Sequence, residues 1–143
     1  MLRLTRRSEY GLMALAFLAS CPRNFCSVRE IVEELNLPKR LLAEVLKSLS
    51  KADLVDATRG PGGGYRLSEP AESIPLSRVV EILEGSVALA DCGGSCTLQP
   101  SCLIQTGIGK VTQSIRQVLD SISVADLLPP ATSSEKSEAA LQV

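Results

Sequence analysis

With 143 residues, the chain is long enough for one domain with a hydrophobic core and an accessory segment, and its 45% hydrophobic content indicates a globular protein. Only 3% of the residues are aromatic, which argues against stacking platforms for single strands, and the absence of histidine excludes every site that requires this residue. The net charge of −1 is unevenly distributed: residues 1–70 carry +3 and residues 71–143 carry −4, which fits a DNA-binding first half and a second half without that role.

A basic and then apolar stretch begins the chain and predicts a largely buried first helix over Thr5–Ala19. Because basic residues precede the apolar run, and residues 18–21 (LASC) resemble a lipoprotein cleavage box, export is an alternative. The run is short, however, and the residues after Cys21 enter a folded motif, so a cytoplasmic protein is the favoured interpretation. No stretch of the sequence is long enough to span a membrane.

The five cysteines are Cys21, Cys26, Cys92, Cys96 and Cys102. Without a secretory segment, they are expected to be thiols or metal ligands rather than disulfides. Cys21 and Cys26 flank the connection after the first helix, and the favoured interpretation is that both are small buried side chains.

Two short helices with a tight turn between them follow. Ser27 and Glu30 have the spacing of a capping box, which predicts a helix start, and apolar residues recur at helical spacing over Val28–Leu35. After a turn at Asn36-Leu37, Pro38 suits a first helical turn because its missing N–H costs nothing there. The apolar stripe of this second helix consists of Leu42, Val45, Leu46 and Leu49.

Charged residues occupy the opposite face of the second helix: Lys39, Arg40, Glu44, Lys47 and Lys51. The first three are placed to reach base edges, as expected near the start of a recognition helix. The two lysines further along suit phosphates. A solvated charged face on an ordinary surface helix is the alternative.

A short hairpin with a glycine-rich tip comes next, with Leu54-Val55 and Tyr65-Arg66-Leu67 as its strands. Glycines permit positive φ and close approach of the backbone, and the residues of the tip are Arg59, Gly60, Pro61, Gly62, Gly63 and Gly64. A nucleotide-binding loop would need Lys-Ser or Lys-Thr after the glycines, whereas Tyr65 follows here. A helix-turn-helix followed by such a hairpin is the order of a winged helix-turn-helix that grips duplex DNA.

The second half predicts two further helices. Apolar spacing over 76–83, with Gly85 as a stop, indicates a linker helix. A longer helix over about 103–121 carries an apolar seam at alternating spacings of four and three, which is too short for a stable coiled coil without other contacts. We expect it to pack on the same helix of a second subunit, with packing on its own domain as the alternative. The seam residues are Ile104, Ile108, Val111, Ile115, Val118 and Ile122.

These elements predict a mainly α protein with a small β wing. A winged helix-turn-helix domain occupies residues 1–70, and a linker helix, cysteine loop and dimerisation helix occupy residues 71–128. A turn at 126–128 is expected to pack on the body. Residues 129–143, which begin with two prolines and continue with serine, glutamate and alanine, are expected to be a disordered tail.

The loop before the last helix contains Cys92, Cys96 and Cys102 with the spacing C-x3-C-x5-C. Thiolates bind soft metals and iron–sulfur clusters, and the glycines between them allow ligands to converge. A four-ligand site needs one more donor, and an incomplete ligand set would suit a sensor. Structural zinc and free thiols are the alternatives. The candidate fourth donors are Asp91, Gln105, Glu9 and an exogenous ligand.

The chain resembles the Rrf-type regulator family over about residues 2–128; members of this family include IscR, NsrR, RirA and CymR. The resemblance is carried by Arg3-Leu4-Thr5, the turn into residues 38–50, Leu54-Val55, the Arg59–Tyr65 wing and the three loop cysteines. It implies a homodimeric winged-helix protein that binds a partly palindromic DNA site, usually as a repressor. In cluster-bearing members, the three cysteines hold an iron–sulfur cluster whose state sets DNA affinity.

Two features depart from the family pattern. The first two loop cysteines are closer together than the five-residue gap of IscR, and Gln105 stands where IscR has a histidine. In NsrR-like members, an acidic residue near the N-terminus of the partner subunit completes the site. Glu9 has that position by its distance from Arg3-Leu4-Thr5, so the resemblance implies Glu9, acting across the dimer, as the fourth ligand of a 2Fe–2S or 4Fe–4S cluster.

The sequence therefore predicts a DNA-binding regulator rather than an enzyme, since no histidine and no convincing nucleophile–base pair is present. A cluster-free repressor that responds to thiol oxidation, zinc or a partner protein is the alternative. A small iron–sulfur electron carrier is a candidate of a different class; it would bind no duplex and would leave the wing unexplained.

Overall fold

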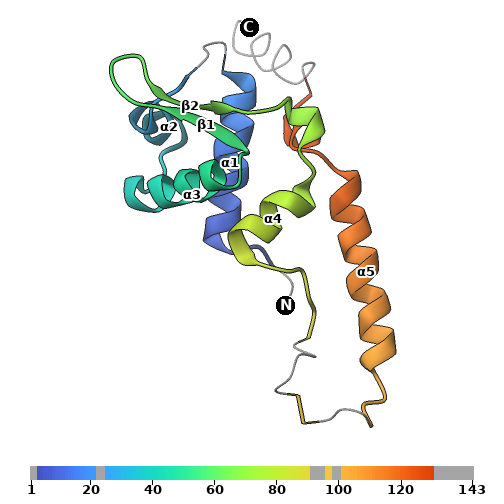
Figure 1. The fold of residues 1–143 in the computed structure, drawn as a ribbon. Coiled ribbons are helices and arrows are strands. Elements are labelled where there is room, and N and C mark those ends of the chain that lie inside the picture. Colours follow the sequence, from blue (N-terminus) through green and yellow to red (C-terminus); the bar gives the residue numbers. More distant parts are fainter. Residues whose placement is uncertain (1–2, 22–24, 91–95, 98–100, 131–143) are drawn as a thin grey trace, which may run out of the picture.

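The computed structural model describes residues 3–21, 25–90, 96–97 and 101–130, which form a helical domain carrying a hairpin, with a long helix beside it (Figure 1). The elements are α1 (Arg6–Ser20), α2 (Val28–Leu35), α3 (Lys39–Lys51), β1 (Val55–Thr58), β2 (Gly64–Leu67), the 3-10 turn η1 (Ala71–Ser73), α4 (Leu76–Glu84), α5 (Gln105–Ser121) and the 3-10 turn η2 (Ala125–Leu127). This order confirms the predicted winged-helix architecture with a C-terminal helix.

Helix α1 lies at the centre of the core and is capped by Thr5. Gly11 allows α4 to approach closely, because a Cβ atom at this position would lie 2.4 Å from Cδ1 of Leu83. The helix packs against α3 and α4, which confirms its predicted burial. Its buried apolar residues are Ala14, Leu15 and Leu18.

The helix-turn-helix is built from α2 and α3. The hydroxyl of Ser27 accepts the N–H of Glu30 at 3.1 Å, and the Glu30 carboxylate accepts the N–H of Ser27 at 2.9 Å, so the predicted capping box is complete. Asn36 has a left-handed φ of 52° and turns the chain toward Pro38, the residue before α3. The predicted apolar stripe of α3 is fully buried at Leu42, Val45, Leu46 and Leu49.

The hairpin is a two-stranded antiparallel sheet in which Val55 lies opposite Leu67. Its first strand begins at Val55 rather than at Leu54, whose side chain is a buried part of the core. On the other edge of β2, Cys26 and Tyr65 exchange two backbone hydrogen bonds of 2.8 Å. The segment before α2 therefore acts as a third strand of the wing.

The prediction that Cys21 and Cys26 are thiols is wrong for this structure, which joins them as a disulfide. Cys26 is buried, as predicted, and Cys21 is half-buried at the C-cap of α1. The prediction relied on the absence of a secretory segment, which gives no information about local geometry. Pairing of Cys26 with Tyr65 fixes it near the end of α1, and this contact is not visible in the spacing of the two cysteines.

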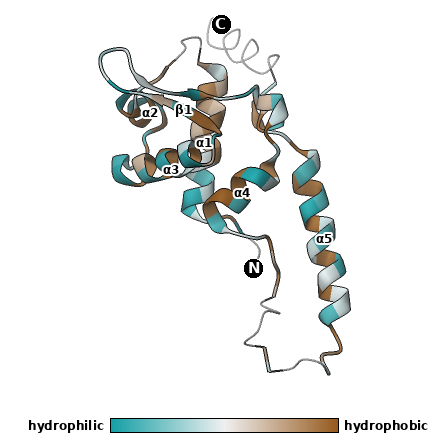
Figure 2. Cartoon of the chain, viewed as in Figure 1, coloured by the Kyte–Doolittle hydropathy of each residue, from teal (hydrophilic) through white to brown (hydrophobic). Residues whose placement is uncertain are grey.

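Beyond the wing, η1 leads into α4, which ends at Gly85 with a φ of 93°, as predicted. Helix α5 starts at Gln105, two residues later than expected, and it stands along the side of the domain (Figure 1). None of its residues is buried, and Val111 and Val118 are 48% and 57% exposed. Apolar and polar residues alternate along the helix (Figure 2). Of the predicted seam, Ile104, Val111 and Val118 are exposed in a single protomer, whereas Ile122 packs against the core.

After α5, the turn η2 packs on the body through Val124, which is fully buried. The predicted turn at this place is confirmed. The predicted disordered tail lies outside the described residues from position 131 onward. Among the helices of the described segments, none has the length and apolar character needed to cross a membrane.

Candidate functional site

The charged face of α3 is open to solvent, as its sequence predicts. The side chains on this face are all exposed, while the opposite stripe is buried against α1 and α4. The helix and the hairpin lie on the side of the molecule that faces away from α5 (Figure 1). The structure thus brings five predicted residues onto one surface: Lys39, Arg40, Glu44, Lys47 and Lys51.

Within this face, Glu44 is held by two arginines. Its carboxylate lies 3.5 Å from Nε of Arg40 and 3.9 Å from Nη1 of Arg7. The Arg40 side chain is 95% exposed, so its guanidinium remains accessible to a ligand. Because these exposed pairs are weak, a phosphate or a base edge can compete for Arg40.

Arg7 is a residue of this surface that the sequence reasoning missed. It belongs to α1, yet its guanidinium donates to Oγ of Ser48 on α3 at 3.3 Å and also lies near Glu44. The pairing depends on the docking of α1 against α3. The local sequence around Arg7 contains no signal for this contact.

The tip of the wing is formed by exposed residues with unusual backbone angles. Gly60 and Gly62 have φ values of 96° and 76°, and the N–H of Gly63 donates to the carbonyl of Gly60 at 3.0 Å. Arg59 and Pro61 are exposed beside them. Small exposed residues of this kind allow a close approach to a nucleic-acid backbone.

At the base of the wing, Gly64 fits closely against the third strand. A Cβ atom there would lie 2.2 Å from the carbonyl oxygen of Cys26, and the φ of Gly64 is 144°. Arg66 has its own partners. Its Nε lies 3.4 Å from Oδ2 of Asp56, and its Cζ lies 4.7 Å from the centre of the Phe25 ring. The strand positions around Arg66 therefore orient the wing, and Arg59 carries the positive charge at its tip.

Two of the three loop cysteines lie within the described residues. Cys96 and Cys102 are half-buried free thiols, whereas Cys92 lies outside the described residues. Across the described segments, no group of three or more potential ligands lies close enough to hold a metal ion. The donors that are described are thiols, and in that respect they fit the chemistry of an iron–sulfur cluster.

Glu9, the expected fourth ligand, lies in the first turn of α1. Its carboxylate is 2.9 Å from Nη1 of Arg6, and its side chain is 36% exposed. Within one protomer it therefore pairs with a cation. A role across a dimer would require Glu9 to exchange this exposed partner.

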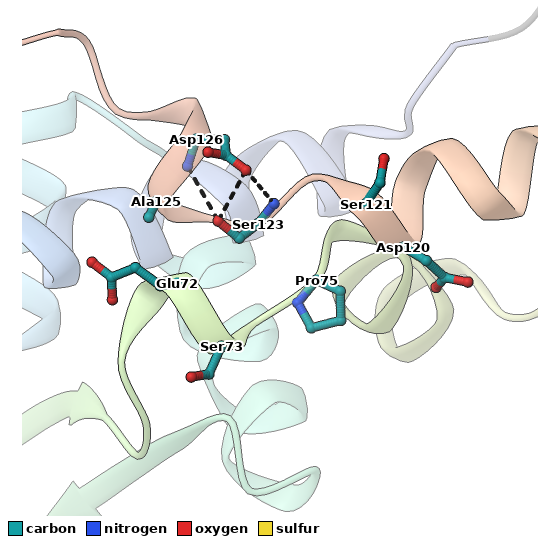
Figure 3. Close-up of a pocket in the computed structure, with 8 residues that line it drawn as sticks. All are labelled: Glu72, Ser73, Pro75, Asp120, Ser121, Ser123, Ala125 and Asp126. Carbon is teal, nitrogen blue, oxygen red and sulfur yellow. Dashed lines mark hydrogen bonds between the residues drawn. The ribbon is translucent and has the colours of Figure 1, made fainter.

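Helix α5 is fixed to the body through a joint beside a cavity of about 520 Å³ (Figure 3). The N–H of Leu76 donates to the carbonyl of Ile122 at 2.8 Å, and that of Val124 donates to the carbonyl of Ile74 at 2.9 Å. Asp126 accepts the N–H of Ser123 at 2.9 Å, as Figure 3 shows. The acidic lining of this cavity, by Glu72, Asp120 and Asp126, makes it unsuitable for DNA phosphates.

A second link connects the start of α1 with the end of α4. The Glu84 carboxylate accepts the N–H of Thr5 at 2.7 Å and its hydroxyl at 2.8 Å. Burial alone would raise the pKa of Glu84, but the hydrogen bonds that its carboxylate accepts, among them the two from Thr5, outweigh burial and lower the pKa below the ordinary value of 4.5. Glu84 is therefore ionised at neutral pH and links the end of α4 to the start of α1.

Residues 4–130 match a protein family described as Rrf2, iron-dependent transcriptional regulator. Among solved structures, CymR of B. subtilis, described as the global cysteine regulator, is 26% identical, covers 89% of this chain and 96% of its own, and gives a TM-score of 0.72. IscR of T. potens is 30% identical over 88% of this chain and 85% of its own, with a TM-score of 0.70. The oxidised form of CymR from Staphylococcus aureus is 28% identical, covers 91% of this chain and 98% of its own, and gives a TM-score of 0.70.

Proposed function

Because the chain belongs to the Rrf2 family of transcriptional regulators, we propose that it is a dimeric repressor whose operator affinity is set by an iron–sulfur cluster in the Cys92–Cys102 loop. The observation that carries this proposal is the exposed basic face of α3 beside a glycine-tipped wing. Such a surface suits a helix in the major groove and a hairpin along the neighbouring backbone.

In this proposal, Lys39, Arg40 and Glu44 read base edges, and Lys47 binds a phosphate. The wing, from Arg59 through Gly60, Pro61, Gly62 and Gly63, contacts the backbone or the minor groove. Arg7 is added to this set because its contact with Glu44 positions a carboxylate in the middle of the recognition face.

The dimer is proposed from α5, whose apolar seam leaves Ile104, Val111 and Val118 exposed in one protomer. Two copies joined along this seam would present two recognition helices to a partly palindromic operator. The joint at Leu76 and Ile122 would transmit a change near the loop to the helix-turn-helix, since it connects α5 directly to the body.

The cluster is assigned to Cys92, Cys96 and Cys102, with Glu9 of the partner protomer as the fourth ligand. When bound, an iron–sulfur cluster would make the loop sensitive to oxidants and to iron supply. The chain itself contributes thiolates just before the N-terminal end of α5. A change in the metal ligands there would take place next to the dimer seam.

Anaerobic purification with iron and sulfide analysis tests the cluster. The protein is expected to be brown, with visible charge-transfer absorption, and Cys96→Ser is expected to lose most of its iron. Cys21→Ser is the matched control, because it removes a cysteine sulfur outside the loop and should retain iron. A colourless protein that contains zinc would contradict the iron–sulfur assignment.

The fourth ligand is tested in the same way. Glu9→Gln is expected to lower iron retention, whereas Glu72→Gln, a change of the same size near α4, is expected to leave it unchanged. Full retention in Glu9→Gln would remove Glu9 from the ligand set.

A second candidate is a cluster-free repressor that responds to thiol oxidation, zinc or a partner protein. The similarity to CymR, described as a cysteine regulator, and the two free thiols at Cys96 and Cys102 favour it. This candidate predicts operator binding by a protein without iron, and oxidation of its thiols would change the affinity.

A further inference from the structure

The Cys21–Cys26 disulfide connects three elements that carry the candidate DNA surface. Cys21 is the C-cap of α1. Cys26 pairs with Tyr65 on β2 and immediately precedes Ser27, the N-cap of α2. A bond at this place therefore links the central helix to both the helix-turn-helix and the wing.

The disulfide is accessible from a cavity of about 390 Å³ that both cysteines line, together with Phe17 and Ser20. Cys26 is only 2% exposed, whereas Cys21 is half-buried at the cavity. Because Cys21 is the more exposed of the two residues, we expect a small reagent that enters this cavity to react with Cys21 first. Exchange chemistry, which requires access to a sulfur atom, is therefore expected to begin at Cys21.

We propose that Cys21 and Cys26 are a reversible thiol–disulfide couple, separate from the cysteine loop, whose oxidation state sets how firmly the wing is held. The oxidant is a small disulfide, RSSR. The Cys21 thiolate attacks one of its sulfurs and expels one RS⁻; the Cys26 thiolate then attacks the Cys21 sulfur of the mixed disulfide and expels the second RS⁻. The two thiol protons pass to the leaving groups, so the products are the Cys21–Cys26 disulfide and two RSH.

The cavity favours neutral or cationic disulfides over anionic ones. Three carboxylates line it, those of Glu30, Glu33 and Glu34, and Glu33 is paired with Arg29 at 2.9 Å. An anionic reagent approaching them is repelled at low ionic strength, and salt screens this repulsion. Oxidised glutathione is thus a poorer reagent here than cystamine or hydroxyethyl disulfide.

The couple influences DNA binding through the third strand of the wing. In the oxidised state shown here, the bond ties Cys26 to α1, so the strand that pairs with Tyr65 is fixed in place. Reduction releases this tie while the two backbone hydrogen bonds remain. In the reduced protein, the strand at Cys26 would have to be ordered when DNA binds, and ordering it costs binding free energy. The reduced protein is therefore expected to bind duplex about fivefold more weakly than the oxidised protein.

Peptide mapping tests the couple without reference to DNA. Trypsin cleaves after Arg7, Arg23 and Arg29, so the disulfide joins two separate peptides, 8–23 and 24–29. Reduced full-length protein treated with cystamine should yield this linked pair, and a thiol reductant should separate it. At low salt, formation of the disulfide should be about tenfold slower with oxidised glutathione than with cystamine. This difference in rate should be smaller at high salt, and it should also be smaller in Glu34→Gln. Failure of the linked pair to form with any reagent would overturn the proposal.

The effect of the couple on DNA affinity rests on the proposed DNA-binding function and is measured in a separate experiment. Wild type and Cys21→Ala, each reduced or treated with cystamine, are titrated onto a duplex of about 40 base pairs enriched from a random library, which is long enough for two half-sites. Wild type should show the fivefold change and Cys21→Ala should not; treatment affects the loop cysteines equally in both proteins. An equal change of DNA affinity in the two proteins would overturn the proposal that this couple controls DNA binding. If the linked peptides form but neither state binds duplex, the proposed function fails, and with it the control of DNA affinity.

Discussion

At the scale of single residues, the charge that α3 presents to a ligand depends on contacts among its own side chains. Glu44 lies between Arg40 and Arg7, and Arg40 is nearly fully exposed. A carboxylate in this position reduces the attraction of the surface for phosphates in general. In the proposed readout, the favoured site would satisfy Glu44 and Arg40 together, since a carboxylate accepts from the amino group of cytosine and an arginine donates to guanine.

Arg40→Ala is expected to weaken operator binding by about 1–3 kcal/mol, because it would remove a bidentate pair with a base edge. Arg29→Ala on α2 is the matched control: it also removes an exposed arginine that pairs with a glutamate one turn away. Fluorescence anisotropy with labelled operator measures both. Unchanged affinity in Arg40→Ala would exclude this residue from base readout.

Glu44→Gln is expected to raise affinity for non-specific duplex, because it frees Arg7 and Arg40 from their carboxylate partner and removes a negative charge from the surface. The ratio of operator to non-specific affinity should fall. A competition titration with mixed-sequence DNA measures this ratio. A ratio equal to that of wild type would show that Glu44 takes no part in discrimination.

The sequence predicted the residues whose positions follow from local periodicity. The register of one helix places Leu42, Val45 and Leu46 in the core and Arg40 on the surface, because it separates the two faces. The sequence alone predicts neither the contacts of Arg7 nor the Cys21–Cys26 disulfide, because each contact joins segments that meet only after the domain folds. No spacing within the chain encodes such a meeting.

At the scale of elements, the position of the wing depends on a close contact between two backbones. Gly64→Ala is expected to destabilise the fold by about 2–3 kcal/mol, because the new Cβ would overlap the Cys26 carbonyl and its φ of 144° suits glycine. Gly60→Ala is the control: its φ is also positive, but nothing lies within 4 Å of the new Cβ. Urea unfolding should show the larger loss in Gly64→Ala; equal losses would contradict the importance of the contact.

The link between α1 and α4 should respond to pH. The folded-state pKa of Glu84 is lowered, so its stabilising contribution is present above the ordinary value of 4.5 and is lost as the pH falls through the folded-state pKa. Wild type should therefore be more stable than Glu84→Gln at about pH 7, and the gap should close as the pH falls below 4.5 and through the folded-state pKa. Thermal unfolding at a series of pH values measures the gap; a gap independent of pH would contradict the role of the ionised carboxylate.

Element boundaries followed from the sequence where a local signal marks them. The capping box at Ser27 and the stop at Gly85 were both predicted correctly, because each is made by residues adjacent in the chain. The third strand at Cys26 was not predicted. A single bridging residue has no periodicity, and its partner Tyr65 is far away in the sequence.

At the scale of the whole molecule, α5 is the element whose surface is least satisfied in one protomer. Leu119 packs against the core, and Arg116 pairs with Glu81 of α4 at 2.8 Å. Val111 and Val118 remain about half exposed on its seam. Burying this seam against a second copy would remove apolar surface from water and stabilise the pair.

The paired substitution Val111→Glu with Val118→Glu is expected to convert the dimer to a monomer, because like charges would face each other across the seam. Gln113→Glu with Gln117→Glu adds the same charge at exposed positions and is the control. Sedimentation equilibrium reports the mass, and circular dichroism verifies that the helices are retained. A dimer that survives the valine substitutions would place the interface elsewhere.

Operator binding as proposed here requires that two protomers together hold one double strand. Anaerobically purified protein should be titrated onto an enriched duplex over a range of salt concentrations, with the mass of the complex measured at each. We expect two protomers per duplex and a logarithm of affinity that falls linearly with the logarithm of salt concentration. A protein that stays monomeric and binds no duplex at low ionic strength would contradict the account.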